Sequence, residues 1–445
     1  MSPQSFAHRV HRFRDALAGS PPLWWSLLYF FSLLCGYYVL RPVRDAMGAS
    51  GNAEAVFPRW LVDWAGGHGY ALGDYTLQVL FSGTFLAMVA LQPLYGALVA
   101  RFPRRVFLPV VYLVFIACLV AFHWLFHTGV SGRGAAFFIW VAVFNLFAVT
   151  VFWSFMADVF DNENARKVYG YIGAGGTIGA LAGPAITRTL VGTVGVANLL
   201  LVSAVFLAVC LLCILKLRPW AIRRERRHGE ASGEEAMGGS VLAGLRLILE
   251  RPLLRALALM LFFGVGVGTL LYNEQAAIVR EHFPGAEAAT RYYATLDWAV
   301  NGLTLVVQLL LTRWLLRRFG VAPALLGPAL AILAGYCLLA ASPLPLMVAI
   351  VQVVLRGGEF SLAKPARETL YTRVDRESRY KAKAAIDTVV YRGGDLAFVW
   401  VHKGLAALGS GIVFLTGIGV AAGMTAAAWA VVRAQRDLPD DRRAQ

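Results

Sequence analysis

Long apolar runs, separated by short polar segments, follow one another along almost the whole chain. Each run has about 20 residues, the length of an α-helix that crosses the roughly 30 Å hydrocarbon core of a bilayer. We therefore expect an all-α membrane protein with about twelve transmembrane helices in two six-helix halves. The predicted spans are 23–43, 76–99, 107–127, 135–157, 169–191, 195–217, 252–276, 292–314, 321–341, 344–366, 384–402 and 409–432.

Between the sixth and seventh runs the apolar pattern stops. Residues 218–240 contain mixed charge, Gly and Ser without apolar periodicity, which is typical of a flexible linker. In Val241–Glu250, Leu and Ile alternate with charged residues at helical spacing, which predicts an amphipathic helix along the inner membrane face. The predicted organisation is a cytoplasmic tail at 1–22, an N-terminal half at 23–217, a cytoplasmic linker with this helix at 218–251, a C-terminal half at 252–432 and a cytoplasmic tail at 433–445.

Composition and charge support a membrane protein. Of 445 residues, 58% are hydrophobic and only 15% are charged, a combination that ordinary soluble domains of this size do not show. The formal net charge of +15 lies mostly in alternate loops, and assigning these loops to the cytoplasm places both termini there. A basic loop beside a span does not imply nucleic acid. We therefore expect the lipid bilayer as a partner, no nucleic acid, and a location in the bacterial inner (cytoplasmic) membrane.

The sequence contains no pattern that indicates an enzyme. Nothing assembles a hydrolytic triad, a zinc constellation or a phosphate loop, so no catalytic residue, metal ligand or cofactor is predicted. The Gly-rich stretch GAGGTIGALAGPAI (173–186) has no following βαβ unit and no Lys for a phosphate loop. Small residues three to four apart let helices approach closely in lipid, so the stretch predicts tight helix packing.

Four ionisable side chains occur near the middle of the tenth and eleventh runs, where each costs at least about 3 kcal/mol on insertion scales. They belong to the motifs RGGE (Arg356 to Glu359) and RGGD (Arg392 to Asp395). Within each motif the charges are three residues apart and share one helix face. Two interpretations stay open: an interhelical salt-bridge lock, or a charged lining that binds substrate. Whether Arg356 pairs with Glu359 or with Asp395 also stays open.

The first run ends in YYVLRPVRD, with Arg41, Arg44 and Asp45 in its last turn. These arginines either anchor the helix at the membrane surface or receive an anion. Glu274, late in the seventh run, and Asp297, in the eighth, are further polar candidates. The predicted substrate-binding residues are Arg41, Arg44, Glu274, Arg356, Glu359, Arg392 and Asp395.

A basic turn follows the second run. The stretch GALVARFPRR (96–105) is similar to the loop signature of the major facilitator superfamily, which contains a Gly, a Leu, an Asp-Arg pair, a Gly and two basic residues. Ala100 stands at the place of the acid, and Pro103 at that of the second Gly. A basic turn after the eighth run, LLRRFGV (315–321), occupies the equivalent place in the second half. The match identifies candidate gating residues at Arg101, Arg104 and Arg105.

A longer resemblance begins at Pro365. The stretch PARETLYTRVDRESRYKAKAAID is similar to the signature of the ATP:ADP antiporter, or nucleotide translocase, family, in which helix 10 runs into a cytoplasmic loop. A second stretch, YYVLRPVRDAM (37–47), resembles a part of the first helix of that family. The matching charged residues in the loop signature are Arg367, Glu368, Asp375, Lys381, Lys383 and Asp387.

This resemblance implies a major facilitator-type bundle that exchanges nucleotides or related anions by alternating access, without a bound cofactor. In that family, transport is associated with acids in helices 4 and 7. The predicted fourth span, 135–157, contains no acid, and Glu274 lies close to the helix 7 position.

Three functions remain open from the sequence. The leading hypothesis is a secondary active transporter of a nucleotide-like or other organic anion, with ATP and ADP as candidate substrates and a proton as a candidate partner. The first alternative is a proton-coupled major facilitator carrier of an unrelated small molecule. The second is a non-transporting membrane scaffold or sensor. None of the three is an enzyme.

Overall fold

The computed structural model describes residues 21–101, 104–160, 162–228, 241–371, 374, 382–383 and 385–435. Every regular element in these ranges is helical, so the predicted all-α class is confirmed. The N-terminal helix group comprises α2 (Pro21–Gly48), α3 (Ala53–Val56), α4 (Arg59–Gly67), the 3-10 turn η1 (Leu72–Tyr75), α5 (Thr76–Arg101), α6 (Arg104–Thr128), α7 (Arg133–Val159) and α8 (Asn162–His228).

The C-terminal helix group contains α-helices and three π-helical turns, labelled η2, η3 and η4. It comprises α9 (Val241–Glu250), α10 (Pro252–His282), α11 (Ala286–Val307), η2 (Gln308–Thr312), α12 (Arg313–Phe319), α13 (Ala322–Ala341), α14 (Pro345–Gly358), η3 (Glu359–Ala363), α15 (Lys364–Tyr371), η4 (Ile386–Val390), α17 (Tyr391–Ala406) and α18 (Ser410–Ala434).

Ten helical stretches in the described ranges are long and apolar enough to cross a bilayer. One of them, Val168–Arg223 in α8, has 56 residues, which at 1.5 Å per residue is about 84 Å and therefore enough for two crossings. The helix is interrupted at Gly195, whose φ of 78° and ψ of 164° are readily adopted only by glycine. The predicted span 384–402 corresponds to η4 and α17. It is not among these ten stretches, because its charged residues lower its mean hydropathy.

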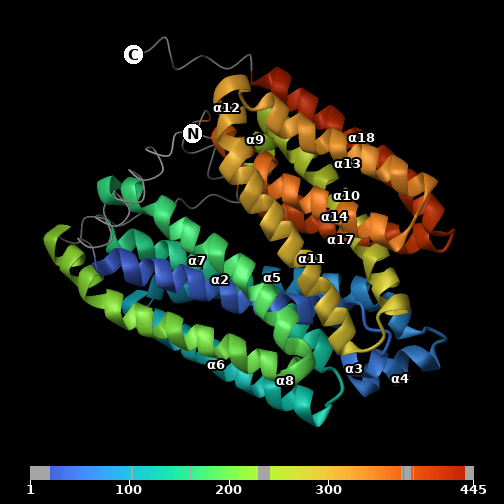
Figure 1. The fold of residues 1–445 in the computed structure, drawn as a ribbon, viewed down its shortest axis with the longest axis horizontal. Helices are drawn as coiled ribbons and strands as arrows, with labels where there is room; N and C mark the ends of the chain where they lie inside the picture. The colour runs from blue at the N-terminus through green and yellow to red at the C-terminus, as the bar shows by residue number, and fades with distance from the viewer. Residues whose placement is uncertain are drawn as a thin grey trace.

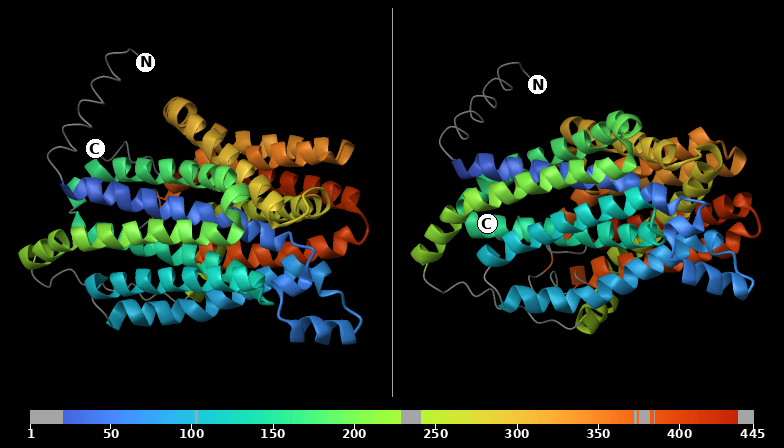
Figure 2. Two further views of the ribbon diagram at one scale, coloured as in Figure 1. Left: turned by 60° about the horizontal axis from the view of Figure 1, so that its bottom comes forward. Right: turned by 90° about the horizontal axis from the view of Figure 1, so that it is seen from below.

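Each helix group has its own hydrophobic core. One core is built from residues between Leu23 and Ala221, and the other from residues between Ile248 and Val431. Figure 1 shows the two groups as bundles that converge near α3 and α4 and diverge toward the chain termini. The two views of Figure 2 show long helices lying side by side along one axis. We call the end where α2 begins and α18 ends the termini end, and the opposite end the far end.

The two groups are joined by hydrogen bonds at the far end, between α17 and the segment made of η1 and α5. We call these bonds the far-end contact. They run from Gln78 Nε2 to the Val399 carbonyl (3.2 Å), from Trp400 Nε1 to Ser82 Oγ (3.2 Å) and from Lys403 Nζ to the Asp74 carbonyl (2.7 Å). The far end is therefore the closed end of the bundle.

Glycines in the predicted packing stretch allow α8 to lie directly against α2. A Cβ atom added at Gly183 would lie 2.7 Å from the Cys35 carbonyl oxygen, and one added at Gly179 would meet the Phe31 carbonyl oxygen. Both neighbours are backbone atoms, which cannot move aside as a flexible side chain would. The stretch thus packs the two helices, as its sequence predicts.

We expect Gly179→Ala to destabilise the protein by about 1–3 kcal/mol, because the added methyl group overpacks the interface between α2 and α8. Thermal unfolding of the purified protein in detergent measures the effect. Gly170→Ala on the same helix is the matched control, since an added Cβ there has nothing within 4 Å. Equal melting temperatures for the two variants would contradict this account of the packing.

Candidate functional site

A cavity of about 750 Å³ lies between the two helix groups, within the usual range for small-molecule sites. Helices from both groups line it, including α2, α7 and α8 on one side and α10, α14 and α17 on the other. Among the described residues, its lining contains six cationic side chains and two carboxylates. The cations are Arg41, Arg44, Arg356, Lys364, Arg367 and Arg392, and the carboxylates are Glu359 and Asp395.

Helix α2 presents two arginines to the cavity, because residues three apart project from one helix face. Arg44 Nη2 donates to Asp45 Oδ1 over 2.6 Å, and Arg41 Nε lies 3.8 Å from Asp45 Oδ2. The hydroxyl of Tyr272, on α10, donates to Asp45 Oδ1 over 3.1 Å. The buried Asp45 carboxylate thus compensates both arginines and connects α2 to the other helix group.

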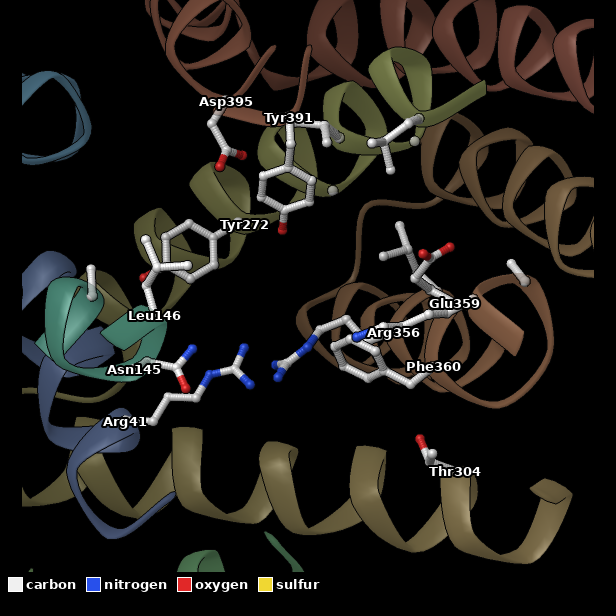
Figure 3. Close-up of a pocket in the computed structure, with 18 of the residues that line it drawn as sticks. Arg41, Asn145, Leu146, Tyr272, Thr304, Arg356, Glu359, Phe360, Tyr391 and Asp395 are labelled. Atoms are coloured by element: carbon white, nitrogen blue, oxygen red, sulfur yellow. The ribbon is translucent and has the colours of Figure 1, made fainter. Parts of the chain in front are cut away.

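Asp297, on α11, forms a second bridge between the groups. Its Oδ1 lies 2.8 Å from Arg356 Nη2, and its Oδ2 lies 3.6 Å from Arg41 Nε. The Asp297 side chain is only 2% exposed. Figure 3 shows the guanidinium groups of Arg41 and Arg356 pointing toward one another across the cavity. We call Arg41, Arg44, Asp45, Asp297 and Arg356 the inter-group charge network.

The RGGE motif does not pair within itself. Arg356 pairs with Asp297, so neither partner considered from the sequence is the observed one. Glu359 Oε1 instead lies 3.2 Å from Arg367 Nη1. The physical reason is the π-helical turn η3, which begins at Glu359 and changes the angular register of the helix. Eight residues correspond to about one π turn plus one α turn, so Glu359 and Arg367 share a face.

The RGGD motif does pair locally. Arg392 Nη1 lies 3.5 Å from Asp395 Oδ2, at the i,i+3 spacing that the sequence indicates. Asp395 Oδ1 also accepts a hydrogen bond from Thr269, on α10, over 3.0 Å. Arg392 keeps 31% of its side chain exposed and lines the cavity. A ligand in the cavity can therefore contact the Arg392 guanidinium group while Arg392 keeps part of its interaction with Asp395.

Two of the π-helical turns face each other beside the cavity. Gln308 Nε2 in η2 donates to the Phe360 carbonyl in η3 over 3.1 Å, and Thr312 Oγ1 donates to the Ser361 carbonyl over 2.8 Å. A π turn leaves backbone carbonyls without their ordinary α-helical partners. These side chains satisfy such carbonyls, so the irregular backbone beside Glu359 and Gln308 is stabilised by the neighbouring helix.

Glu274 has a different environment from the other predicted site residues. Glu274 and His402 are both within the described ranges, and neither lines the cavity. Glu274 Oε1, on α10, lies 2.8 Å from His402 Nε2, on α17. The other six predicted binding residues line the cavity. Substrate contact remains a prediction for all seven.

The loop signature is described only in part. Lys383 Nζ lies 2.6 Å from Glu368 Oε2, and Arg367 pairs with Glu359 near the termini end. These contacts bring signature residues together and place Arg367 on the cavity. The side chains of Arg101, Arg104, Arg105 and Asp387, and residues Asp375 and Lys381 as a whole, lie outside the described part of the chain.

Several residues in or beside the cavity are not among the predicted binding residues. Asp297 gave the clearest signal, as a lone acid within a predicted span, yet nothing in the sequence pairs it with Arg41 or Arg356. Lys364 lies at the edge of the tenth predicted span and looks like an interfacial residue from sequence. Uncharged polar residues such as Asn145 are common in membrane helices, so they gave no signal.

Comparisons with known proteins agree with this architecture. A family model of the Major Facilitator Superfamily matches residues 55–397. ADP,ATP carrier protein 1 of Chlamydia muridarum (strain MoPn / Nigg) is 23% identical, with 87% of this chain and 82% of the relative covered. ADP,ATP carrier protein 1 of Chlamydia trachomatis serovar D is 22% identical, with 57% of this chain and 55% of the relative covered.

Solved structures share the fold at low sequence identity. The nucleoside transporter NupG superposes with a TM-score of 0.57 at 13% identity, over 93% of this chain and 100% of that one. A POT family transporter in complex with 5-aminolevulinic acid gives a TM-score of 0.61 at 12% identity, over 93% and 96%. The predicted bundle and the resemblance to ADP,ATP carriers are thereby confirmed. Because the family model matches well over half of its length, the chain belongs to the Major Facilitator Superfamily of membrane transporters.

Proposed function

We propose that this transporter is a secondary carrier that moves a nucleotide-like or other organic anion by alternating access. The observation that carries the proposal is the charge of the central cavity. Six cations line it, whereas the acids in or beside it among the described residues are Asp45, Asp297, Glu359 and Asp395. Among the described residues, the site therefore has an excess of two positive charges. An anion restores electroneutrality in a site where uncompensated charge is costly.

The aromatic side chains in the lining favour an anion that also contains a ring. Phe30 and Tyr38, from α2, and Phe85, from α5, line the side of the N-terminal group, and Phe360 and Tyr391 line the opposite side. Planar rings stack on such side chains, while phosphate or carboxylate groups pair with arginine. The similarity to the two chlamydial ADP,ATP carrier proteins supports a nucleotide as the first substrate to test.

The inter-group charge network suggests how binding is coupled to alternating access. Arg41 Nε and Asp297 Oδ2 are 3.6 Å apart, and each is buried without a hydrogen-bond partner among the described residues. An anionic group that binds Arg41 and Arg356 competes with Asp297 for them. This competition loosens the connection between α2 and α11 only while the anion is bound. The anion therefore binds more tightly to the conformation in which these helices separate, and such a difference in affinity is what a conformational shift requires.

We propose the bacterial inner membrane as the location, with both termini in the cytoplasm. The basic residues of alternate loops support this orientation under the positive-inside rule. The far-end contact then closes the cavity on the other side of the membrane. As a carrier, the protein needs no catalytic residue and no bound cofactor.

Exchange in proteoliposomes tests the function. We expect labelled ATP to enter vesicles that contain internal ADP, to enter poorly without internal nucleotide, and to do so without a pH gradient. A panel of other organic anions, added as competitors, ranks the substrates. Uptake of an unrelated solute that requires the pH gradient would support the proton-coupled carrier instead. Failure of every nucleotide and organic anion to enter would overturn the proposal and favour a scaffold or sensor.

A further inference from the structure

A buried acid and a buried histidine form a pair outside the lining of the cavity. Glu274 is 5% exposed and His402 is 8% exposed, and their facing atoms are 2.8 Å apart. His402 Nδ1 is also buried, with no hydrogen-bond partner among the described residues. A buried ionisable pair is expensive within a membrane, and an unpaired ring nitrogen adds to that cost.

We propose that Glu274 and His402 form a proton-binding site that controls closure of the far end. In the form without the extra proton, a neutral His402 donates its Nε2–H to the Glu274 carboxylate, and Nδ1 is a free acceptor. One proton from water binds at Nδ1 and makes an imidazolium, and no other bond forms or breaks. The net charge of the pair then changes from −1 to zero.

The position of His402 connects this proton to the contact between the helix groups. His402 lies on α17 between Val399 and Lys403, and both of these residues bond to the N-terminal group in the far-end contact. Trp400, two residues before His402, makes the third bond. A change in the attraction between His402 and α10 therefore acts on the segment of α17 that closes the far end.

Charge and solvation give the direction of the effect. While the far end is closed, the pair is dry, and a dry site favours the form with zero net charge. Opening the far end admits water, which reduces the cost of the form with a charge of −1. The proton therefore stabilises the closed far end, and its release favours opening.

Among the described residues, the other titratable groups near the pair have partners of their own. On α13, Tyr336 is close enough to sense the Glu274 charge, but its hydroxyl donates to the Val267 carbonyl over 2.6 Å. On α17, Lys403 binds the Asp74 carbonyl, and Arg392 and Asp395 pair with each other.

Of the remaining elements packed against α10 and α17, α9 contributes Arg246 and Glu250, which pair with each other, and α11 contributes Glu287, Arg291 and Asp297. Helix α5 has no charged residue before Arg101, and α18 has none before Arg433, both at the termini end. The charged residue of α14 is Arg356, which pairs with Asp297. Among the described residues near the far-end contact, the Glu274–His402 pair therefore combines burial with an unpaired ring nitrogen.

Distance measurements between two spin labels across the far end test the proposal. Labels replace Tyr70 and Leu408, exposed positions of the two helix groups, in a chain whose five cysteines are replaced by Ala or Ser. Between about pH 5 and pH 8, the range in which histidine titrates, we expect the fraction with the longer, open distance to rise at least threefold. One coupled proton allows up to about tenfold per pH unit.

The variant His402→Gln keeps a polar side chain and should remove the pH dependence. Glu274→Gln should reverse its direction, because the pair then has zero net charge only without the proton. His282→Gln, at the exposed end of α10, is the matched histidine control and should leave it intact. A distance distribution that does not change with pH in the unsubstituted background would overturn the proposal, as would an unchanged response in His402→Gln. If one variant fails to fold, the other variant and the labelled chain that keeps Glu274 and His402 still test the proposal. No substrate is present, so the result is independent of the transport assay.

Discussion

Replacing Asp297 by Ala is expected to lower the free energy of unfolding by about 3–5 kcal/mol, because it leaves buried cations without their counter-charge. The Asp297 carboxylate lies 2.8 Å from Arg356 and 3.6 Å from Arg41, and those side chains are only 12% and 15% exposed. We also expect loss of nucleotide exchange, since the connection between α2 and α11 depends on this carboxylate. Chemical unfolding of the purified protein and uptake in proteoliposomes measure the two effects.

Asp63→Ala is the matched control for this variant. Asp63 lies on α4 with an exposed side chain, so its removal should change the unfolding free energy by less than about 0.5 kcal/mol. If Asp297→Ala were as stable as the Asp63 control, the inter-group charge network would not contribute to the fold. If Asp297→Ala also exchanged nucleotides at the normal rate, the proposed competition with the substrate would be wrong.

Replacing Arg392 by Ala should reduce uptake about 10- to 100-fold, as expected for loss of one charged hydrogen bond to an anionic substrate. The fold should survive, because Arg392 is 31% exposed and Asp395 keeps its hydrogen bond from Thr269. Initial rates of labelled ATP uptake into ADP-loaded proteoliposomes check the prediction. The thermal melting temperature confirms that the variant is folded.

Arg188→Ala serves as the control for Arg392→Ala. Arg188 is an exposed arginine on α8 that does not line the cavity as the described residues define it, so its loss should leave uptake within about twofold. Normal uptake by Arg392→Ala would remove this arginine from the substrate site. Equal losses in both variants would point to a general effect of surface charge and not to a specific contact.

The contacts separate the intramembrane charges into buried pairs and cavity-lining residues, and substrate contact stays a prediction. Asp45 and Asp297 are buried acids that connect the helix groups, Asp45 through Tyr272 and Asp297 through Arg41. Arg392 belongs to the cavity lining and interacts only weakly with Asp395. Arg41 and Arg356 pair with Asp297 and also line the cavity, so an anion that binds there is best placed to disturb these pairs through them.

The three π-helical turns also bear on conformational change. In the described ranges all three occur in the C-terminal helix group, at Gln308, Glu359 and Ile386. Such turns are frequent at functional sites. The turn at Glu359 brings this residue onto the same face as Arg367, eight residues later, a pair that an unbroken α-helical period does not predict.

The sequence by itself determined the membrane environment, the helical class and most of the spans. These follow from apolar runs of the right length, because no water satisfies backbone polar groups within a bilayer. It also predicted six of the residues that line the cavity, since any charge kept within a span is rare enough to stand out. The pairing of Arg392 with Asp395 could be predicted from the sequence because the two residues are only three positions apart on one helix.

Only the tertiary structure decided which charges meet across the chain. Arg41 and Asp297 are separated by more than 250 residues, and Glu274 and His402 by 128. No local periodicity encodes such contacts, because they depend on how two separately packed helix groups are oriented. The same orientation places Glu274 away from the cavity and beside the far-end contact. The sequence could show that these charges are costly, but only the fold shows what compensates each of them.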